Sequence, residues 1–295
     1  MKVEIECLSC IIHRGYLEIA EATKNQKLQF KAASMLLGYL AKEFSPNAVA
    51  AILGTTRDRI IKRISGNPDV YREKKHVSNQ IAMSLLPQLK KMIETETTPE
   101  KRFRKATLAA IVGNIIEFDI PKHEVNFDQL GQLVVDAELD LAVDEISGIY
   151  QKVRKANTIL YLTDNAGEIA LDKLLIDELK QLGLNVTVAV KSGPILNDAT
   201  LEDAKAVNIL DLADRVITTG ADAVGLPIPE ERSTEFTEAY DHTDFVIAKG
   251  MGYAETLTET VLKQPHALLL RTKCNPVAKH FGVARGKNVA KLMIH

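Results

Sequence analysis

Residues 158–182 read TILYLTDNAGEIALDKLLIDELKQL, and this stretch indicates the fold of the chain. It opens with an apolar run of strand length and closes with apolar residues at helical spacing, from Ile169 to Leu179. Between the two, Gly167 lets the chain turn sharply, and the helix then begins with backbone N–H groups directed back at the strand end. In a parallel sheet, such a turn is where ligands usually bind. We therefore expect a strand, a ligand-binding turn and a helix.

The turn carries three side chains with oxygen atoms: Asp164, Asn165 and Glu168. Carboxylate and amide oxygens are hard ligands that suit Mg²⁺ or Mn²⁺. The alternative is purely structural: Asp164 and Asn165 cap the helix, and Glu168 complements its dipole. The turn alone does not decide between these two interpretations.

Composition limits the class of protein. The chain has 295 residues, 46% of them hydrophobic and 26% charged, which is typical of an ordinary globular protein. A formal charge of −2 gives no support to nucleic-acid or membrane-surface binding, and no apolar run is long enough to span a bilayer. The N-terminus does not look like a signal peptide, and three cysteines argue against a disulfide framework. We expect a cytoplasmic protein.

The spacing of apolar residues changes along the chain. The first part reads as helical, punctuated by proline and glycine, whereas short apolar runs alternate with helices from Thr158 onward. This alternation predicts an α/β fold: a Rossmann-like parallel sheet with helices on both faces, preceded by an all-helical N-terminal region. We place the helical region at 1–155 and the α/β domain at 156–295. The strands are expected at residues 158–162, 185–190, 215–219, 245–248 and 267–270.

The turns after these strands should converge on one edge of the sheet. Acidic or amide residues follow two of the strands, and lysines follow three: Lys191, Lys249 and Lys273. Carboxylates hold a metal ion and ammonium groups neutralise phosphoryl oxygens, so this combination favours a site for a cation and a phosphate.

At this point the sequence resembles a known family, the metal-dependent damage-control phosphatases, formerly domain of unknown function 89. It is most similar to the stand-alone prokaryotic members with an N-terminal CxxC. The resemblance covers nearly the whole chain. The matching segments are CLSC (7–10), NPDVYREKKHVSN (67–79), GNIIEFD (113–119), TDNAGE (163–168), VKSGPILNDAT (190–200), TTGADAVGLP (218–227), AKGMGYAET (248–256) and RTKCNPVA (271–278).

The resemblance implies hydrolysis of phosphate monoesters of small metabolites, either sugar phosphates or related damaged phosphometabolites. It implies a divalent metal ion held by Asp164, Asn165 and Asp198, and phosphate binding by Lys273. The metal is expected to be Mg²⁺ or Mn²⁺, with Ni²⁺ or Co²⁺ as further options. Two positions depart from the family pattern, Gly252 and Glu117, and both bear on the choice of substrate.

The catalytic residues are expected to be Asp164 and Lys273. The nucleophile is left open between a water molecule on the metal and Asp164 itself, which would form an aspartyl-phosphate. The helix N-terminus after Gly167 is expected to add backbone N–H donors. Asp198 has the structural alternative of a helix N-cap.

Other polar residues are expected to bind the substrate. Lys249 precedes Gly250, whose missing Cβ allows close approach of a ligand, and Gly220 serves the same need. Asn114 lies among isoleucines and valine, where burial without partners is costly, so we place it in a pocket between the domains. Glu255 is expected to meet a substrate hydroxyl or orient water. The predicted substrate-binding set is Asn114, Glu168, Lys191, Gly220, Lys249 and Glu255.

The motif Cys7-x-x-Cys10 is followed at the same spacing by His13. It fits a zinc site only with a fourth ligand, and Cys274 is the one further thiol in the sequence. It also fits a redox pair, or two small residues of a helix. We assign no metal to it.

Two other functions are alternatives. A strand followed by an acidic turn also begins the fold of S-adenosylmethionine-dependent methyltransferases, but the turn lacks their glycine-rich loop. A non-catalytic protein that binds nucleotides or sugar phosphates would have no need of the metal ligands. The predicted partner is a small phosphorylated metabolite, with neither nucleic acid nor membrane involved.

Overall fold

The computed structural model describes residues 1–113 and 134–294, and within these ranges seven strands form one sheet. The strand order is β1-β7-β6-β5-β2-β3-β4. All neighbouring strands are parallel except β6 and β7, which are antiparallel. The strands are β1 (Leu141–Asp144), β2 (Thr158–Leu162), β3 (Asn185–Val190), β4 (Arg215–Thr218), β5 (Phe245–Lys249), β6 (His266–Arg271) and β7 (Asn288–Met293).

The predicted α/β fold is confirmed, and all five expected strands are present to within one residue at each end. Two further strands, β1 and β7, join the sheet at one side. β1 lies before residue 156, in the part of the chain that reads as helical. It has only four residues, whose exposure alternates as at a sheet margin, so it lacks the apolar run that marks the central strands.

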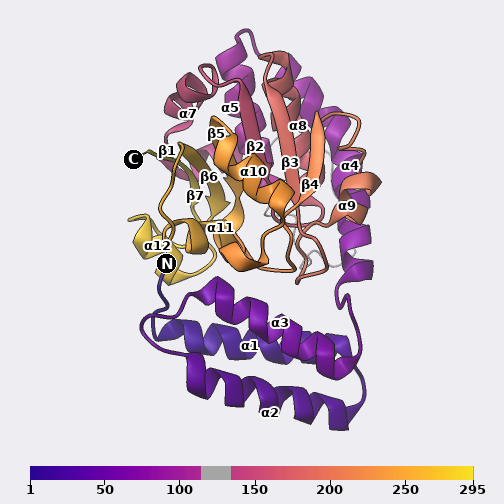
Figure 1. Ribbon diagram of the computed structural model, residues 1–295. Coiled ribbons are helices and arrows are strands. Elements are labelled where there is room, and N and C mark those ends of the chain that lie inside the picture. Colours follow the sequence, from indigo (N-terminus) through magenta and orange to yellow (C-terminus); the bar gives the residue numbers. More distant parts are fainter. Residues whose placement is uncertain (114–133, 295) are drawn as a thin grey trace.

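Helices cover both faces of the sheet (Figure 1). One face is covered by α4, α5, α7, α8 and α9, and the other by α10, α11 and α12. In the described residues the helices are α1 (Glu6–Ala22), α2 (Gln26–Glu43), α3 (Ala50–Ser65), α4 (Arg72–Glu94), α5 (Pro99–Val112), α7 (Ile146–Val153), α8 (Glu168–Gln181), α9 (Leu201–Ala206), α10 (Thr234–His242), α11 (Gly250–Leu257) and α12 (Asn275–His280).

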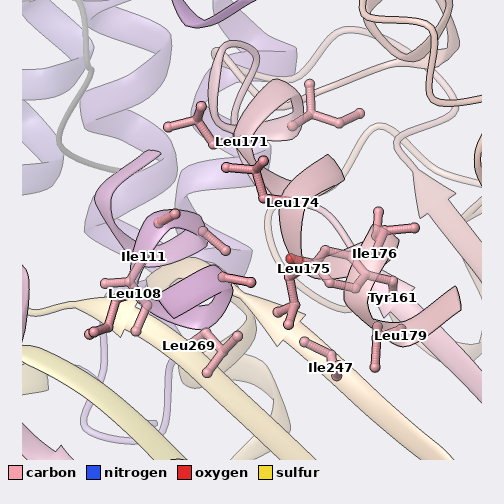
Figure 2. Close-up of a cluster of buried hydrophobic side chains, with 14 of the residues drawn as sticks. Leu108, Ile111, Tyr161, Leu171, Leu174, Leu175, Ile176, Leu179, Ile247 and Leu269 are labelled. Atoms are coloured by element: carbon pink, nitrogen blue, oxygen red, sulfur yellow. The ribbon is translucent and has the colours of Figure 1, made fainter. Parts of the chain in front are cut away.

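The larger core lies between the sheet and the helices α5 and α8. Figure 2 shows Leu175 and Leu179 of α8 beside Tyr161 of β2, with Leu108 and Ile111 of α5 nearby. Helix α8 is buried on nearly all sides because α4 and α5 pack over its outer face. It therefore holds the turn at its N-terminus, residues 163–167, in a fixed place on the sheet.

Helices α1, α2 and α3 lie together beyond one end of the sheet (Figure 1). They have small apolar cores of their own. Helix α3 is linked to the loops after β3 and β4 by polar contacts: Asp58 Oδ1 accepts from the backbone N–H of Leu196 at 3.1 Å, and Arg59 pairs with Asp222 at 2.8 Å. Because these loops follow the carboxyl ends of parallel strands, the three helices lie over the edge where the site was expected.

The position of the site follows from the strand order. Strands β3 and β4 lie on one side of β2, while β5, β6 and β7 lie on the other. The order therefore reverses between β2 and β5, and in open α/β sheets ligands bind in the crevice at such a reversal. Asp164 and Asn165 follow β2, and Gly250 follows β5.

Candidate active site at the carboxyl ends of β2, β3 and β5

The turn after β2 is bound to the loop after β3 by backbone hydrogen bonds. Ala199 N–H donates to the carbonyl of Asp164 at 2.7 Å, and Ala166 N–H donates to the carbonyl of Asn197 at 2.8 Å. These bonds place Asn165 opposite Asp198 in an antiparallel bridge. The structure thus brings together the three residues predicted to bind a metal ion, although 33 positions separate Asn165 from Asp198 in the chain.

Asn165 connects the acidic groups of the turn. Its amide nitrogen donates to Asp164 Oδ2 at 2.8 Å and to Glu168 Oε2 at 3.1 Å. The carbonyl oxygen of the amide is then the atom that remains for a cation. The same turn is held from outside by Asn79 of α4, whose Oδ1 accepts from Gly167 N–H at 2.7 Å.

Asp198 contributes a buried oxygen atom without a hydrogen bond. Among the described residues, Oδ2 of Asp198 accepts no hydrogen bond, and the nearest cationic group paired with it is Lys191 Nζ at 3.6 Å. Burial raises the pKa of the Asp198 carboxyl to about 6, whereas the charge of Lys191 lowers it. A buried carboxylate oxygen with no donor is costly unless a cation completes its environment, so this atom fits a metal ligand.

Asp164 lies next to Asp198 and is partly exposed. Burial raises the pKa of its carboxyl well above the ordinary range, and the charges of Asp198 and Glu168 raise it further. Lys273 and Lys191 act in the opposite direction. The charge of Asp198 thus disfavours the ionised form of Asp164, and a divalent cation between the two carboxylates would relieve this repulsion.

The chemistry of the donor set, two carboxylates and one amide, fits a hard divalent cation with open positions for water and substrate. In the described residues, no three His, Cys, Asp or Glu side chains converge as a ready metal cluster. The candidate centre contains only two such residues, and its third ligand is the amide of Asn165. It is therefore suited to a catalytic ion and unlike a closed structural zinc site.

The two lysines next to the site are both fully buried. Lys191 Nζ donates to the carbonyl of Gly225 at 2.7 Å and lies 4.4 Å from the ring centre of Tyr253, whose hydroxyl is 3.3 Å away. Lys249 Nζ donates to Glu168 at 2.5 Å, to Asp172 at 2.7 Å and to the carbonyl of Ala110 at 2.8 Å. Lys249 thus lies beneath the turn and fixes Glu168, instead of opening towards a pocket.

The remaining residues predicted for the site do not lie in the turn after β2 or the loop after β3. Lys273, in the loop after β6, and Glu255, on α11, line a cavity of about 210 Å³ between α1, α3 and α11. Gly220 is exposed. It has a φ of +95°, and an added Cβ would lie 2.0 Å from the backbone nitrogen of Ser233, so its conformation serves the packing of its own loop. Asn114 lies outside the described residues.

Most of the expected N–H donors at the start of α8 are used within the protein. Gly167 N–H bonds to Asn79, Ala166 N–H to Asn197, and Ile169 N–H to the carbonyl of Asn165. Few of these donors are therefore left for a ligand.

Sequence reasoning gave no role to two residues that support the site. Tyr253 contacts Lys191 on the face of the sheet opposite to Lys249, and Asp172 shares the ammonium of Lys249 with Glu168. The spacing of four residues from Glu168 to Asp172 places both carboxylates on one side of α8, which is a signal that the sequence does contain.

Comparison with known proteins shows the family to which the chain belongs. Residues 3–289 match the model of the damage-control phosphatase ARMT1-like domain, so the chain belongs to that family of phosphatases. Damage-control phosphatases of Archaeoglobus fulgidus and Pyrococcus horikoshii are 34% and 33% identical to it, over 99% and 97% of this chain and 100% and 96% of theirs. An uncharacterised protein of Methanocaldococcus jannaschii is 38% identical over 98% of this chain and 95% of its own.

A solved structure shows the same fold. The crystal structure of a DUF89 family protein from Pyrococcus horikoshii, at 2.04 Å resolution, superimposes with a TM-score of 0.87 over 98% of both chains, at 33% identity. The predicted family is therefore confirmed. None of the helices in the described part of the chain is long and apolar enough to cross a membrane.

Proposed function

We propose that this protein is a divalent-metal-dependent phosphatase that hydrolyses phosphate monoesters of small metabolites, such as sugar phosphates or their damaged forms. Membership of the damage-control phosphatase family supports the reaction. The observation that carries the metal dependence is the buried Oδ2 of Asp198, to which the described part of the chain donates no hydrogen bond and which lies next to the carboxyl of Asp164.

In this proposal Asp164, Asn165 and Asp198 hold the cation, for which Mg²⁺, Mn²⁺, Ni²⁺ and Co²⁺ are the candidates. When bound, a divalent cation polarises a phosphoryl oxygen and lowers the pKa of a coordinated water. Glu168 and the Asn165 amide keep Asp164 in one orientation through their hydrogen bonds. Lys191 sets the position of Asp198 through an ion pair, with Lys191 Nζ 3.6 Å from Asp198 Oδ2.

Lys273 supplies the second positive partner. Its charge lowers the pKa of Asp164, so its ammonium group is within electrostatic reach of that carboxyl. An ammonium group there neutralises charge on the oxygens of the transferring phosphoryl group, which is most of what phosphoryl transfer requires of a protein. Asp164 is the ligand that is partly exposed, so it is also the residue placed to act as a nucleophile.

The test is release of phosphate from p-nitrophenyl phosphate by protein stripped of metal with a chelator, before and after each of the four cations is restored. Activity should return only with a divalent cation. Asp164→Ala and Asp198→Ala should abolish hydrolysis and also divalent binding measured by calorimetry, while Asp241→Ala, on exposed α10, should change neither. Full activity in the stripped protein, or unchanged metal affinity in both site variants, would remove the metal from the reaction.

The same stripped protein separates the alternatives. A non-catalytic binding protein would bind phosphorylated metabolites without releasing phosphate under any cation. A subsequent screen of sugar phosphates and other phosphorylated metabolites would then identify the substrate.

A further inference from the structure

All three cysteines of the chain line one cavity. Cys7 and Cys10 reach it from the first turns of α1, and Cys274 from the N-cap of α12, within the same cavity of about 210 Å³ that Lys273 and Glu255 border. The three come from the two ends of the sequence, so only the folded chain brings them together. None of them is part of the candidate metal centre, and all three are free thiols.

The first turn of α1 brings the side chains of Cys7 and Cys10 onto one side. The chain enters α1 through two i to i+3 hydrogen bonds, from Cys7 N–H to the carbonyl of Glu4 at 3.0 Å and from Leu8 N–H to that of Ile5 at 3.2 Å. Cys7 and Cys10 are themselves residues i and i+3 of the α-helix that follows. Residues three apart on a helix also have Cβ atoms only about 5–6 Å apart, so a small tightening reaches the spacing of a disulfide.

The three thiols differ in accessibility. Cys10 is exposed, whereas Cys7 and Cys274 are partly buried. Burial raises the pKa of the Cys7 thiol and raises that of Cys274 to about 11. Cys10 is therefore the thiol that a reagent from solution meets first, and Cys7 is its neighbour on the same helix, whereas Cys274 comes from the N-cap of α12.

We propose that Cys7 and Cys10 form a reversible dithiol–disulfide pair, which is oxidised by exchange with a small disulfide entering this cavity. The Cys10 thiolate attacks one sulfur of the small disulfide and releases one thiolate, which leaves a mixed disulfide on Cys10. The Cys7 sulfur then attacks the Cys10 sulfur and releases the second thiolate. The two protein thiols lose two electrons to the small disulfide, and their two protons pass to the released thiolates.

Oxidation of this pair is coupled to the loop that carries Lys273. The same turn of α1 is attached to α12, because Glu6 Oε2 accepts from Asn275 Nδ2 at 3.3 Å and Glu4 pairs with Lys279 at 2.9 Å. Tightening the turn to close a disulfide pulls on Asn275, two residues beyond Lys273. This part of the proposal rests on the phosphatase function, and it predicts that the disulfide form turns over more slowly. A displacement of about 1 Å in a positioning group can cost up to about 10²-fold in rate.

The chemical test does not depend on activity. The reduced protein is incubated with oxidised glutathione, blocked with iodoacetamide and digested, and the cysteine peptides are identified by mass spectrometry. We expect a Cys7–Cys10 disulfide in the parent and in Cys274→Ser, a glutathione mixed disulfide retained on Cys10 in Cys7→Ser, and no internal disulfide in Cys10→Ser. A disulfide that includes Cys274, or a mixed disulfide in the parent that never resolves, overturns the pair.

Metal analysis of the purified protein gives a second check. One equivalent of bound zinc or iron that prevents the thiols from reacting would show that the cysteines are a metal site, and would also overturn the pair. Hydrolysis by the oxidised and reduced parent is then compared with that of Cys7→Ser treated identically. We expect dithiothreitol to restore a rate lost by about tenfold in the oxidised parent alone. Equal rates in both redox forms overturn the coupling to Lys273, whereas inactivity of the reduced protein counts against the phosphatase function itself.

Discussion

Gly250 lies against the carboxyl group of Asp164: a Cβ atom built on Gly250 would lie 1.9 Å from Asp164 Oδ2. The glycine also has a φ of +82°, a conformation that other residues adopt only at a cost. It is the first residue after β5, so the end of one strand shapes the space for a side chain that follows its neighbour β2. The position of the candidate metal ligand Asp164 therefore depends on the absence of a side chain at Gly250.

Gly250→Ala should move Asp164 and weaken divalent binding by about 10- to 100-fold, the usual effect of disturbing a group that orients a metal ligand. The matched control is Gly183→Ala. Gly183 has nearly the same φ, +80°, but an added Cβ there meets nothing within 4 Å. Both variants should lose about 1–2 kcal/mol of stability from the backbone conformation. Calorimetry should then show weakened Mn²⁺ binding in Gly250→Ala alone, and equal affinities in the two variants would contradict this role of Gly250.

Lys273→Ala should lower the hydrolysis rate by about 10²–10³-fold, the range found when one partner of a developing negative charge is removed. Divalent affinity should change little, because the lysine is not a ligand. Lys279→Ala provides the control, since Lys279 is an exposed lysine of the adjacent helix α12. Rates at saturating metal decide the question, and a Lys273→Ala variant as fast as the parent would exclude the assignment.

Lys249→Met should destabilise the fold by about 3–5 kcal/mol, because Glu168 and Asp172 would be left as buried carboxylates without their cation. The same change at exposed Lys263, which pairs with Asp241 at 3.0 Å, should cost less than about 1 kcal/mol. Urea unfolding of both variants measures the difference. Similar small losses in the two would mean that the buried ion pairs of Lys249 contribute no more than a surface pair.

Glu255 should make stability depend on pH. Burial raises the pKa of its carboxyl to about 7 from an ordinary value of 4.5, although the chain's amino terminus, Arg14 and Ala51 N–H lower it. Between these two values the folded protein keeps a proton that the unfolded chain releases, so this group's contribution to stability decreases as the pH rises from about 4.5 to about 7.

Glu255→Gln removes that titration. The free energy of unfolding of the parent minus that of the variant should fall across this pH window and be flat above it. Urea unfolding at several pH values measures this difference, with exposed Glu238→Gln as the control. A difference that does not vary with pH, or that rises with it, would show that the carboxyl of Glu255 is not held in its neutral form.

The sequence pattern predicted five strands of the sheet and missed the two at one side, β1 and β7. Residues 159–162 and 245–248 are continuous apolar runs, and 186–190 departs from one only at Thr187, as expected of strands covered on both faces. β7 contains a lysine, pairs antiparallel and follows a six-residue helix, so it breaks the alternation that identified the other strands. The metal ligands Asp164, Asn165 and Asp198 were brought together because turns after parallel strands meet at one edge, although their role as ligands stays a prediction.

The lysines show what such reasoning leaves out. Side chains alternate between the two faces of a strand, so Lys249 lies on the same face as Phe245 and Ile247, beneath α5 and α8. Lys191 lies on the opposite face, next to Tyr253 of α11. Their positions at the ends of strands suggested an open pocket for both. The alternation of side chains along β5, however, places Lys249 on the face covered by α8, where Glu168 lies. The sequence also could not show that Gly167 N–H is already taken, because Asn79, which accepts its hydrogen bond, is 88 residues away in the chain.

The hydrogen bonds between the turn after β2 and the loop after β3 have a consequence for folding. Asp164 and Asp198 meet only when β3 has paired with β2, and Gly250 shapes the space of Asp164 only when β5 has paired on the other side. An unfolded or half-assembled chain has no such site, so a ligand of this edge binds the native state alone. Its binding free energy then adds to the stability of the whole domain, and the ligand concentration in the cell becomes one of the quantities that determine how much of the chain is folded.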